Sequence, residues 1–175
     1  MPPHLILFAV AAFAWRLLTL AISARHEKAL KRDGAQEYGA KNSILLAVFH
    51  VIYYVCAVVE STARSHQPNA LVSAGGIAIY IASTFVLVSV IRSLGGLWTI
   101  KIIISPQHRR VQSGLFSFVR HPNYFLNILP ELIGFALALN AYWTLVIGIP
   151  LYFIPLVTRI RQEEAAMRET FAPDL

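Results

Sequence analysis

The sequence predicts an all-α membrane protein with about five transmembrane helices. Of its 175 residues, 57% are hydrophobic and only 14% are charged, and the mean hydropathy is +0.59. These values lie far from those of a soluble globular domain. The hydrophobic residues form separate runs, and the first covers about 20 residues, enough to cross a bilayer core of about 30 Å. The length fits one domain, so we interpret residues 1–175 as a single integral membrane domain.

Charge and cysteine content narrow the classes of function. The single cysteine, Cys56, lies in an apolar run, so we expect no disulfide framework, no cysteine metal cluster and no redox chemistry. We predict no metal. The net charge of +6 would suggest nucleic acid in a soluble protein, but here the basic residues lie between apolar segments, where they set topology. We therefore expect no nucleic-acid partner.

The first apolar run, residues 3–23, predicts span 1, with Pro2 and Pro3 at its start, where proline is tolerated. No positive segment precedes it and Arg16 interrupts it, which makes it a poor signal peptide and favours a retained span. Two interpretations of Arg16 stay open. Its side chain snorkels to the headgroups, or it pairs with an acid inside the bundle.

Two more spans follow a charged connector. Residues 25–42 predict a solvated connector that is helical up to Gly34, a helix stop signal. Span 2, residues 43–59, carries His50 deep inside it, as either a functional group or a structural hydrogen-bond partner. Span 3, residues 70–91, contains small residues that let transmembrane helices approach closely. No GxGxxG spacing occurs, which excludes a Rossmann domain.

The second half of the chain predicts a basic segment and a helical hairpin. Residues 92–121 form a long segment that is rich in turn residues, and a segment of this kind in so small a protein is expected to have a function. We expect it to pack on the bundle and to form the wall of a pocket. Span 4 covers residues 123–139, Asn140 is the turn, and span 5 covers residues 141–157. A charged helix, residues 158–171, follows. Three prolines should kink the hairpin: Pro130, Pro150 and Pro155.

Topology follows from the distribution of basic residues. Thirteen of the 15 Lys and Arg lie in the first connector, in the basic segment and in the tail, whereas the loop after span 2 holds only Arg64. The positive-inside rule then places the N-terminus outside and the C-terminus in the cytoplasm. We predict an integral membrane protein with this orientation.

Two polar stretches flank the hairpin, "GLFSFVRHPNY" at 114–124 and "RIRQEE" at 159–164. A tight hairpin would bring them together on the cytoplasmic side. In the first stretch, Pro122 constrains the backbone of His121, the first free N–H groups of the span can meet an anion, and Tyr124 offers a ring and a hydroxyl.

The second stretch supplies carboxylates. The carboxylates of Glu163 and Glu164 are suited to bind the hydroxyls of a ribose or a cationic centre. The two stretches together therefore predict a site for a charged, nucleoside-like cofactor at the cytosolic surface.

Residues 94–164 resemble the isoprenylcysteine carboxyl methyltransferases and their bacterial relatives, a wider group that includes phospholipid N-methyltransferases. The motifs that carry this resemblance are "LGGLWT", then "HRRVQSGLFSFVRHPNY", then "RIRQEE" after two spans. Members of that family bind S-adenosylmethionine without a Rossmann fold, between the cytosolic ends of the last helices and the preceding linker. The resemblance implies a catalytic linker and hairpin over residues 94–171.

The resemblance also implies roles for individual residues. Glu163 matches the cofactor-binding glutamate of the family, and Arg159, one turn earlier on the same face, matches the arginine assigned to the substrate. Arg159 and Glu163 are therefore the predicted catalytic residues. The predicted cofactor-binding residues are His108, Arg109, Arg110, Val111, Phe116, His121, Pro122, Asn123, Tyr124 and Glu163.

Three positions depart from the pattern of the family. Arg110 stands where leucine is usual, Phe116 where tyrosine is common, and Lys101 where eukaryotic members have glutamine. The loss of the tyrosine hydroxyl removes one contact that the family pattern would provide.

An acid lies inside span 4. Glu131 is seven residues, or two turns, past Tyr124 on roughly the same face. An acid at this depth is costly unless it has a partner. It is either a structural partner for Arg16 or His50, or a substrate-binding group that lines the acceptor pocket.

The resemblance implies an S-adenosylmethionine-dependent methyltransferase acting on a carboxylate or hydroxyl of a lipophilic acceptor from the bilayer. The chain looks more like the small bacterial branch, some of which resemble alkylpyrone methyltransferases, than like the eukaryotic enzymes. This resemblance implies a bacterial inner-membrane location. Three alternatives stay open: a phospholipid or other lipid N-methyltransferase, a non-catalytic membrane binding protein, and an NADPH-dependent membrane reductase.

Overall fold

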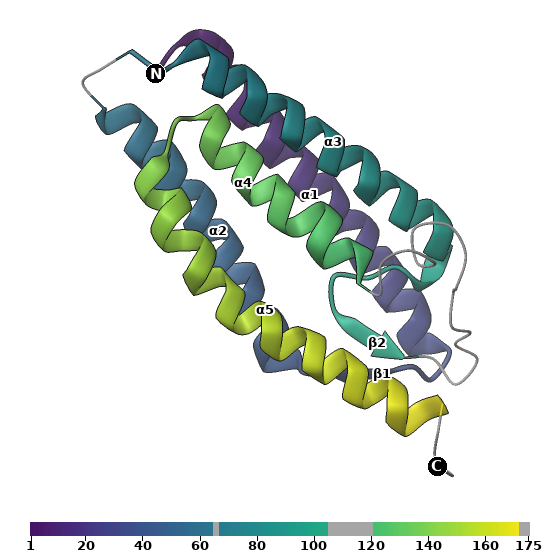
Figure 1. Ribbon diagram of the computed structural model, residues 1–175. Helices are drawn as coiled ribbons and strands as arrows, with labels where there is room; N and C mark the ends of the chain where they lie inside the picture. Colours follow the sequence, from purple (N-terminus) through teal and green to yellow (C-terminus); the bar gives the residue numbers. More distant parts are fainter. Residues whose placement is uncertain (65–66, 105–120, 172–175) are drawn as a thin grey trace.

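The computed structural model describes residues 1–64, 67–104 and 121–171, and helices dominate these ranges. Figure 1 shows the helices running alongside one another as one bundle. Their bounds are α1 Pro3–Arg32, α2 Ala40–Ala63, α3 Ala70–Leu94, the short 3-10 helix η1 Gly95–Leu97, the π-helical η3 Asn123–Ile128, α4 Leu129–Ala138 and α5 Tyr142–Phe171.

Four of these helices, α1, α2, α3 with η1, and α5, are long and apolar enough to cross a membrane. The helix formed by η3 and α4 is apolar but shorter. Large hydrophobic side chains such as Leu7, Leu71 and Trp143 are more than 70% exposed, which suits contact with lipid. The predicted all-α polytopic membrane fold is confirmed, with the long helices reaching beyond the predicted spans at several of their ends.

Helices α3 and α4 touch through their backbones. A Cβ atom on Gly134 would lie 2.6 Å from the backbone nitrogen of Tyr80, and one on Gly76 would lie 2.7 Å from the carbonyl oxygen of Gly134. Small residues permit this close approach, as the composition of span 3 predicted. Of the two adjacent glycines, Gly76 meets α4, whereas a Cβ atom on Gly75 would meet nothing within 4 Å.

The three prolines of the hairpin lie in two helices, α4 and α5. Pro130 lies at the start of α4, directly after the π-helical turn. Because proline has no amide hydrogen and its ring crowds the preceding turn, the regular α-helical bonding pattern cannot run through this position. Pro150 and Pro155 lie inside α5, which changes direction near its middle in Figure 1.

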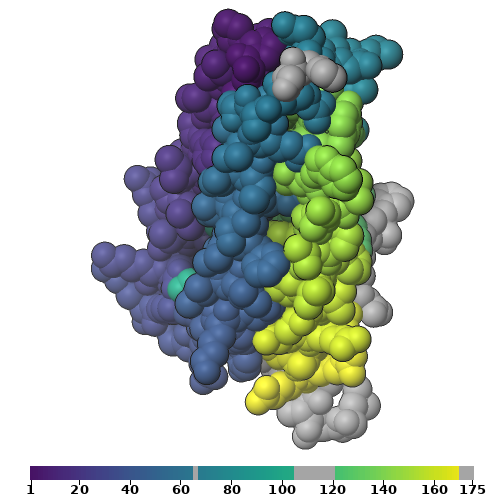
Figure 2. All heavy atoms as spheres, turned by 90° about the vertical axis from the view of Figure 1, so that its left-hand side faces the viewer, coloured from purple at the N-terminus to yellow at the C-terminus, as the bar shows by residue number. Residues whose placement is uncertain are grey.

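A tight turn joins α4 to α5. Asn140 adopts a positive φ of 55°, a conformation that asparagine tolerates better than most residues, and so confirms the predicted turn. Its side chain donates to Ser73 Oγ at 2.6 Å and accepts from the Asn69 amide at 2.9 Å. The carboxylate of Glu60 then accepts from the first amides of α5. Helices α2 and α5 lie side by side along one face of the molecule in Figure 2.

A small antiparallel sheet corrects the interpretation of the first connector as a solvated loop. Helix α1 ends before Gly34, as predicted, but β1, Gln36–Tyr38, pairs with β2, Ile102–Ile104, in the basic segment. The three isoleucines of β2 are buried, so this part of the segment packs back on the bundle as expected. Lys101, directly before β2, reinforces the pairing through a 3.3 Å contact with Glu37 of β1, and a 2.7 Å contact with Glu27 ties it to α1.

Candidate active site

The hairpin brings the two polar stretches together at one end of the bundle. Tyr124 lies in the first turn of η3, and its hydroxyl donates a short hydrogen bond to the carboxylate of Glu163 on α5. Nε2 of His121 lies 3.2 Å from Oε1 of Glu164. The rings of His121 and Tyr124 stack with their centroids 5.7 Å apart. Side chains about 40 residues apart in sequence therefore form one polar cluster.

Arg159 is buried and contacts this cluster through Tyr124. It is only 4% exposed, and each of its three nitrogens donates to a protein oxygen. Nε donates to the hydroxyl of Tyr124 at 3.2 Å, Nη1 donates to Oγ of Ser43 at 2.6 Å, and Nη2 donates to the carbonyl of Ile100. The arginine therefore joins α5 to η3, to α2 and to the start of the basic segment.

The remaining motif residues form the first turn of η3. Pro122 directly precedes η3, and the carbonyl of His121 accepts from the amides of Tyr124 and Phe125. Oδ1 of Asn123 accepts from Nδ2 of Asn127 at 3.1 Å. The side chain of Asn127 is buried, and its Oδ1 has no hydrogen-bond partner among the described residues.

Two side chains of this site, those of Ser43 and Asn127, were not predicted from the sequence, and neither was the contact of the Ile100 carbonyl with Arg159. Ser43 gave no signal beyond its place at the start of span 2. Asn127 stands four residues after Asn123, a spacing that places two amides on one helical face, and this could have drawn attention to it. Five predicted cofactor residues lie outside the described residues: His108, Arg109, Arg110, Val111 and Phe116.

Glu131 lies deeper in the bundle, in a separate polar network. It is 2% exposed and takes a bidentate contact from Arg16, with Nε donating to Oε1 at 2.5 Å. The hydroxyl of Tyr54 donates to the same oxygen at 2.5 Å, and Nε2 of His50 lies 3.6 Å away. These contacts match the interpretation of Glu131 as a structural partner. For Arg16 they match the interpretation that its side chain pairs with an acid inside the bundle, and they do not match a side chain that snorkels to the headgroups.

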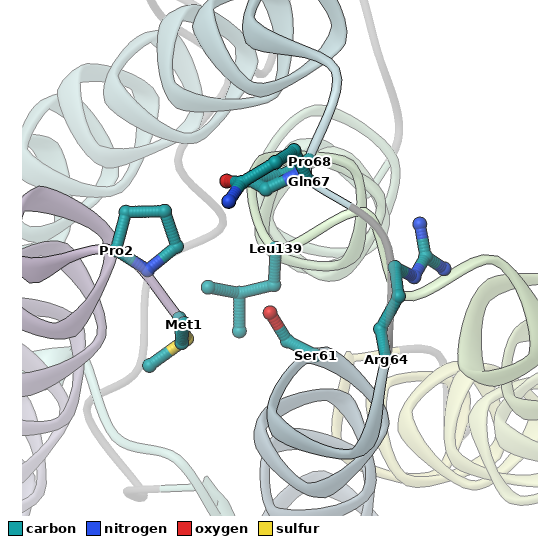
Figure 3. A pocket seen from close by; sticks show the side chains of 7 residues that line it. All are labelled: Met1, Pro2, Ser61, Arg64, Gln67, Pro68 and Leu139. Carbon is teal, nitrogen blue, oxygen red and sulfur yellow. The ribbon is translucent and has the colours of Figure 1, made fainter.

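A pocket of about 330 Å³ opens at the opposite end of the bundle. It lies where α1 begins and α2 and α4 end, and Figure 3 shows the guanidinium of Arg64 pointing away from its centre. That guanidinium instead lies 4.9 Å from the ring centroid of Tyr142 and 3.6 Å from Glu60. Neither predicted motif contributes to this pocket, so we place the candidate site at the other end.

Fold and site together define a polytopic membrane protein with a carboxylate, tyrosine and arginine cluster where its terminal helical hairpin opens. Comparison with known families is consistent with this class. The family model described as "Isoprenylcysteine carboxyl methyltransferase (ICMT) family" matches residues 76–169, more than half of the chain. The protein belongs to this family.

Two bacterial relatives extend the similarity over nearly the whole chain. An uncharacterized protein of Haemophilus influenzae is 47% identical over 90% of this chain and 91% of its own length. An uncharacterized protein of Bacillus subtilis, YpbQ, is 27% identical over 88% of this chain and 90% of its own length. No solved structure matches the chain.

Proposed function

We propose that the protein is an S-adenosylmethionine-dependent membrane methyltransferase that methylates a carboxylate or hydroxyl of a lipophilic acceptor. Membership of a methyltransferase family, matched over the residues that form the cluster, is the observation that carries this proposal. The geometry supports it, because His121, Tyr124, Arg159 and Glu163 come from two separate motifs and meet at one end of the hairpin.

The residues of the cluster fit the chemistry of this cofactor. S-Adenosylmethionine carries a ribose diol, a cationic sulfonium and an amino acid group. Glu163 uses one carboxylate oxygen for Tyr124, and its other oxygen accepts no hydrogen bond from the described residues, so it can accept from a diol or face a cation. Oδ1 of Asn127 in η3 accepts no hydrogen bond from the described residues and is a second acceptor.

The chain itself contributes position and exclusion of water. The bound cofactor would supply an electrophilic methyl group, and in-line transfer then needs the acceptor oxygen held close and aligned. Tyr124 and Glu163 would fix one side of the site, and the buried wall of Arg159 and β2 would keep water out. An ionised carboxylate or enol needs no general base.

We place the site on the cytoplasmic side of a bacterial inner membrane, with the N-terminus outside. The positive-inside rule supports this orientation, since the connector and segment that form the sheet are rich in Lys and Arg. The cofactor would enter from the cytoplasm and the acceptor from the bilayer. Residues 1–175 act as one domain in this proposal.

Calorimetric titration of the detergent-purified protein with S-adenosylhomocysteine tests the cofactor assignment. We expect micromolar binding by the wild type and loss of binding in Glu163→Ala and His121→Ala. Glu169→Gln, an exposed acid on the same helix, should bind like the wild type. Absence of heat with folded wild type would contradict the proposal, and binding of NADPH in the same cell would favour a reductase.

A further inference from the structure

Arg159 is the least accessible charged group among the described residues of the candidate site. A buried guanidinium is costly unless protein groups satisfy its donors. Here three acceptors from three parts of the chain do so: a tyrosine hydroxyl, a serine hydroxyl and a backbone carbonyl. No carboxylate of the described residues contacts it directly. With 4% exposure, it offers little surface to an acceptor arriving from the membrane.

The hydroxyl of Tyr124 connects Arg159 to the carboxylate. It accepts from Nε of Arg159 at 3.2 Å and donates its own hydrogen to Glu163. A hydroxyl whose oxygen accepts a hydrogen bond from a cation becomes a stronger hydrogen-bond donor, because successive hydrogen bonds polarise one another. Arg159 thereby fixes the direction of the hydroxyl, and the hydroxyl fixes the orientation of the Glu163 carboxylate.

Arg159 also contacts the residues that lead into β2. Its Nη2 donates to the carbonyl of Ile100, whose amide in turn donates to Oγ of Ser23 on α1 at 2.8 Å. Ile100 is therefore tied to α5 on one side and to α1 on the other. It lies two residues before β2.

We infer that Arg159 is a positioning residue, which acts on the cofactor site through Tyr124 and Ile100 and does not bind the methyl acceptor. This inference rests on the proposed function and departs from the role that the family resemblance implied for Arg159. The acceptor would then be recognised by other groups, and Arg159 would set the affinity for the cofactor.

The affinity for S-adenosylhomocysteine, measured by calorimetry, tests this inference with no acceptor present. We expect Arg159→Gln and Tyr124→Phe each to weaken binding roughly tenfold, the order expected for one charge-assisted hydrogen bond. The double variant should be no weaker than Arg159→Gln alone, because that change already breaks the connection to the Tyr124 hydroxyl. Arg159→Lys should not restore affinity, since an ammonium cannot make three contacts in a planar fork.

Matched control variants distinguish a positioning role of Arg159 from a general loss of folded structure. Arg161→Gln, an exposed arginine on the same helix, should bind like the wild type. Ser43→Ala removes one contact of Arg159 and leaves the Tyr124 hydroxyl in place, so we expect a smaller loss, about threefold, that shrinks in the Tyr124→Phe background, where only the connection through Ile100 is left. This pair of backgrounds carries the test if Arg159→Gln does not fold.

The outcomes are distinct. Wild-type affinity in Arg159→Gln, or losses that multiply in the double variant, would overturn the inference and leave the proposed function standing. An equal effect of Ser43→Ala in both backgrounds would overturn it as well. Absence of binding by the folded wild type would overturn the proposed function itself, and the inference with it.

Discussion

Arg16 of α1 and Glu131 of α4 form a bidentate ion pair inside the helix bundle, although 115 residues separate them in sequence. The hydroxyl of Tyr54 on α2 donates to the same carboxylate and lies 3.3 Å from the hydroxyl of Tyr80 on α3. One network therefore joins four helices. In a bundle surrounded by lipid, where hydrophobic contact discriminates poorly between neighbours, such polar contacts select the helix partners.

Breaking this ion pair should destabilise the bundle strongly. We expect Arg16→Met to lower the stability of the purified protein by about 3–5 kcal/mol, because it leaves a buried carboxylate without its cation. Adding Glu131→Leu should restore most of the loss, since the uncompensated charge is then gone. Thermal unfolding in detergent measures both effects, with Arg25→Met, exposed on the same helix, as the control.

The same double variant separates the two interpretations of Glu131. A restored melting temperature together with wild-type methyl transfer would show a structural role alone. A restored melting temperature with lost methyl transfer would instead show that Glu131 lines the acceptor pocket. Unchanged stability in both single variants would contradict the importance of the pair.

The contact between α3 and α4 should not tolerate one added methyl group. Gly134→Ala would place its Cβ against the backbone of Tyr80, which cannot move aside as a side chain can, and we expect a loss of about 1–3 kcal/mol. Gly75→Ala is the matched control, because its Cβ would meet nothing within 4 Å and alanine favours the helix. Equal melting temperatures for the two variants would refute the backbone contact.

The sheet should depend on pH through its charged neighbours. The hydrogen bond with Glu27 raises the pKa of Lys101 above its ordinary 10.5, and the hydrogen bond from Lys31 lowers the pKa of Glu37 below its ordinary 4.5. The contribution of Lys101 is therefore fully present below about 10.5 and is lost as pH rises through the raised pKa. That of Glu37 is present above about 4.5 and is lost as pH falls through the lowered pKa.

Lys101→Met should accordingly reduce stability by about 0.2–1 kcal/mol near neutral pH, since these side chains are partly exposed. The difference from wild type should shrink at both ends of the pH range and at high salt. Melting curves from about pH 3 to 12, which extend past both ordinary pKa values, check this, with exposed Lys41→Met as the comparison. A difference that stays constant with pH would show that Lys101 acts by packing alone.

Local signals explain what the sequence predicted well. Long apolar runs, the glycine that follows α1 and the turn residue Asn140 determine helices and their ends from neighbouring residues only. The two motifs flanking the hairpin could be placed together because a helical hairpin returns the chain to its starting level. His121 and Glu164 meet for that reason.

Contacts that depend on helix rotation or on backbone atoms could not be predicted. Whether the side chain of Arg16 reaches the headgroups or pairs with Glu131 depends on which face of α1 points into the bundle. The sequence of a helix that is apolar on most sides does not indicate that face. The three-residue strands are too short for a periodic signal. Ile100 contributes a carbonyl to Arg159, and a carbonyl has no signature in the sequence.

Methyl transfer itself tests the central claim most directly. The purified protein would be incubated with S-adenosylmethionine carrying a deuterated methyl group and with lipid extracts of Haemophilus influenzae and Bacillus subtilis, the organisms of the two relatives. Mass spectrometry would follow the label. We predict labelled, lipid-soluble product with the wild type and none with Glu163→Ala. Cofactor binding without label in any fraction would contradict a methyltransferase acting on a lipophilic acceptor.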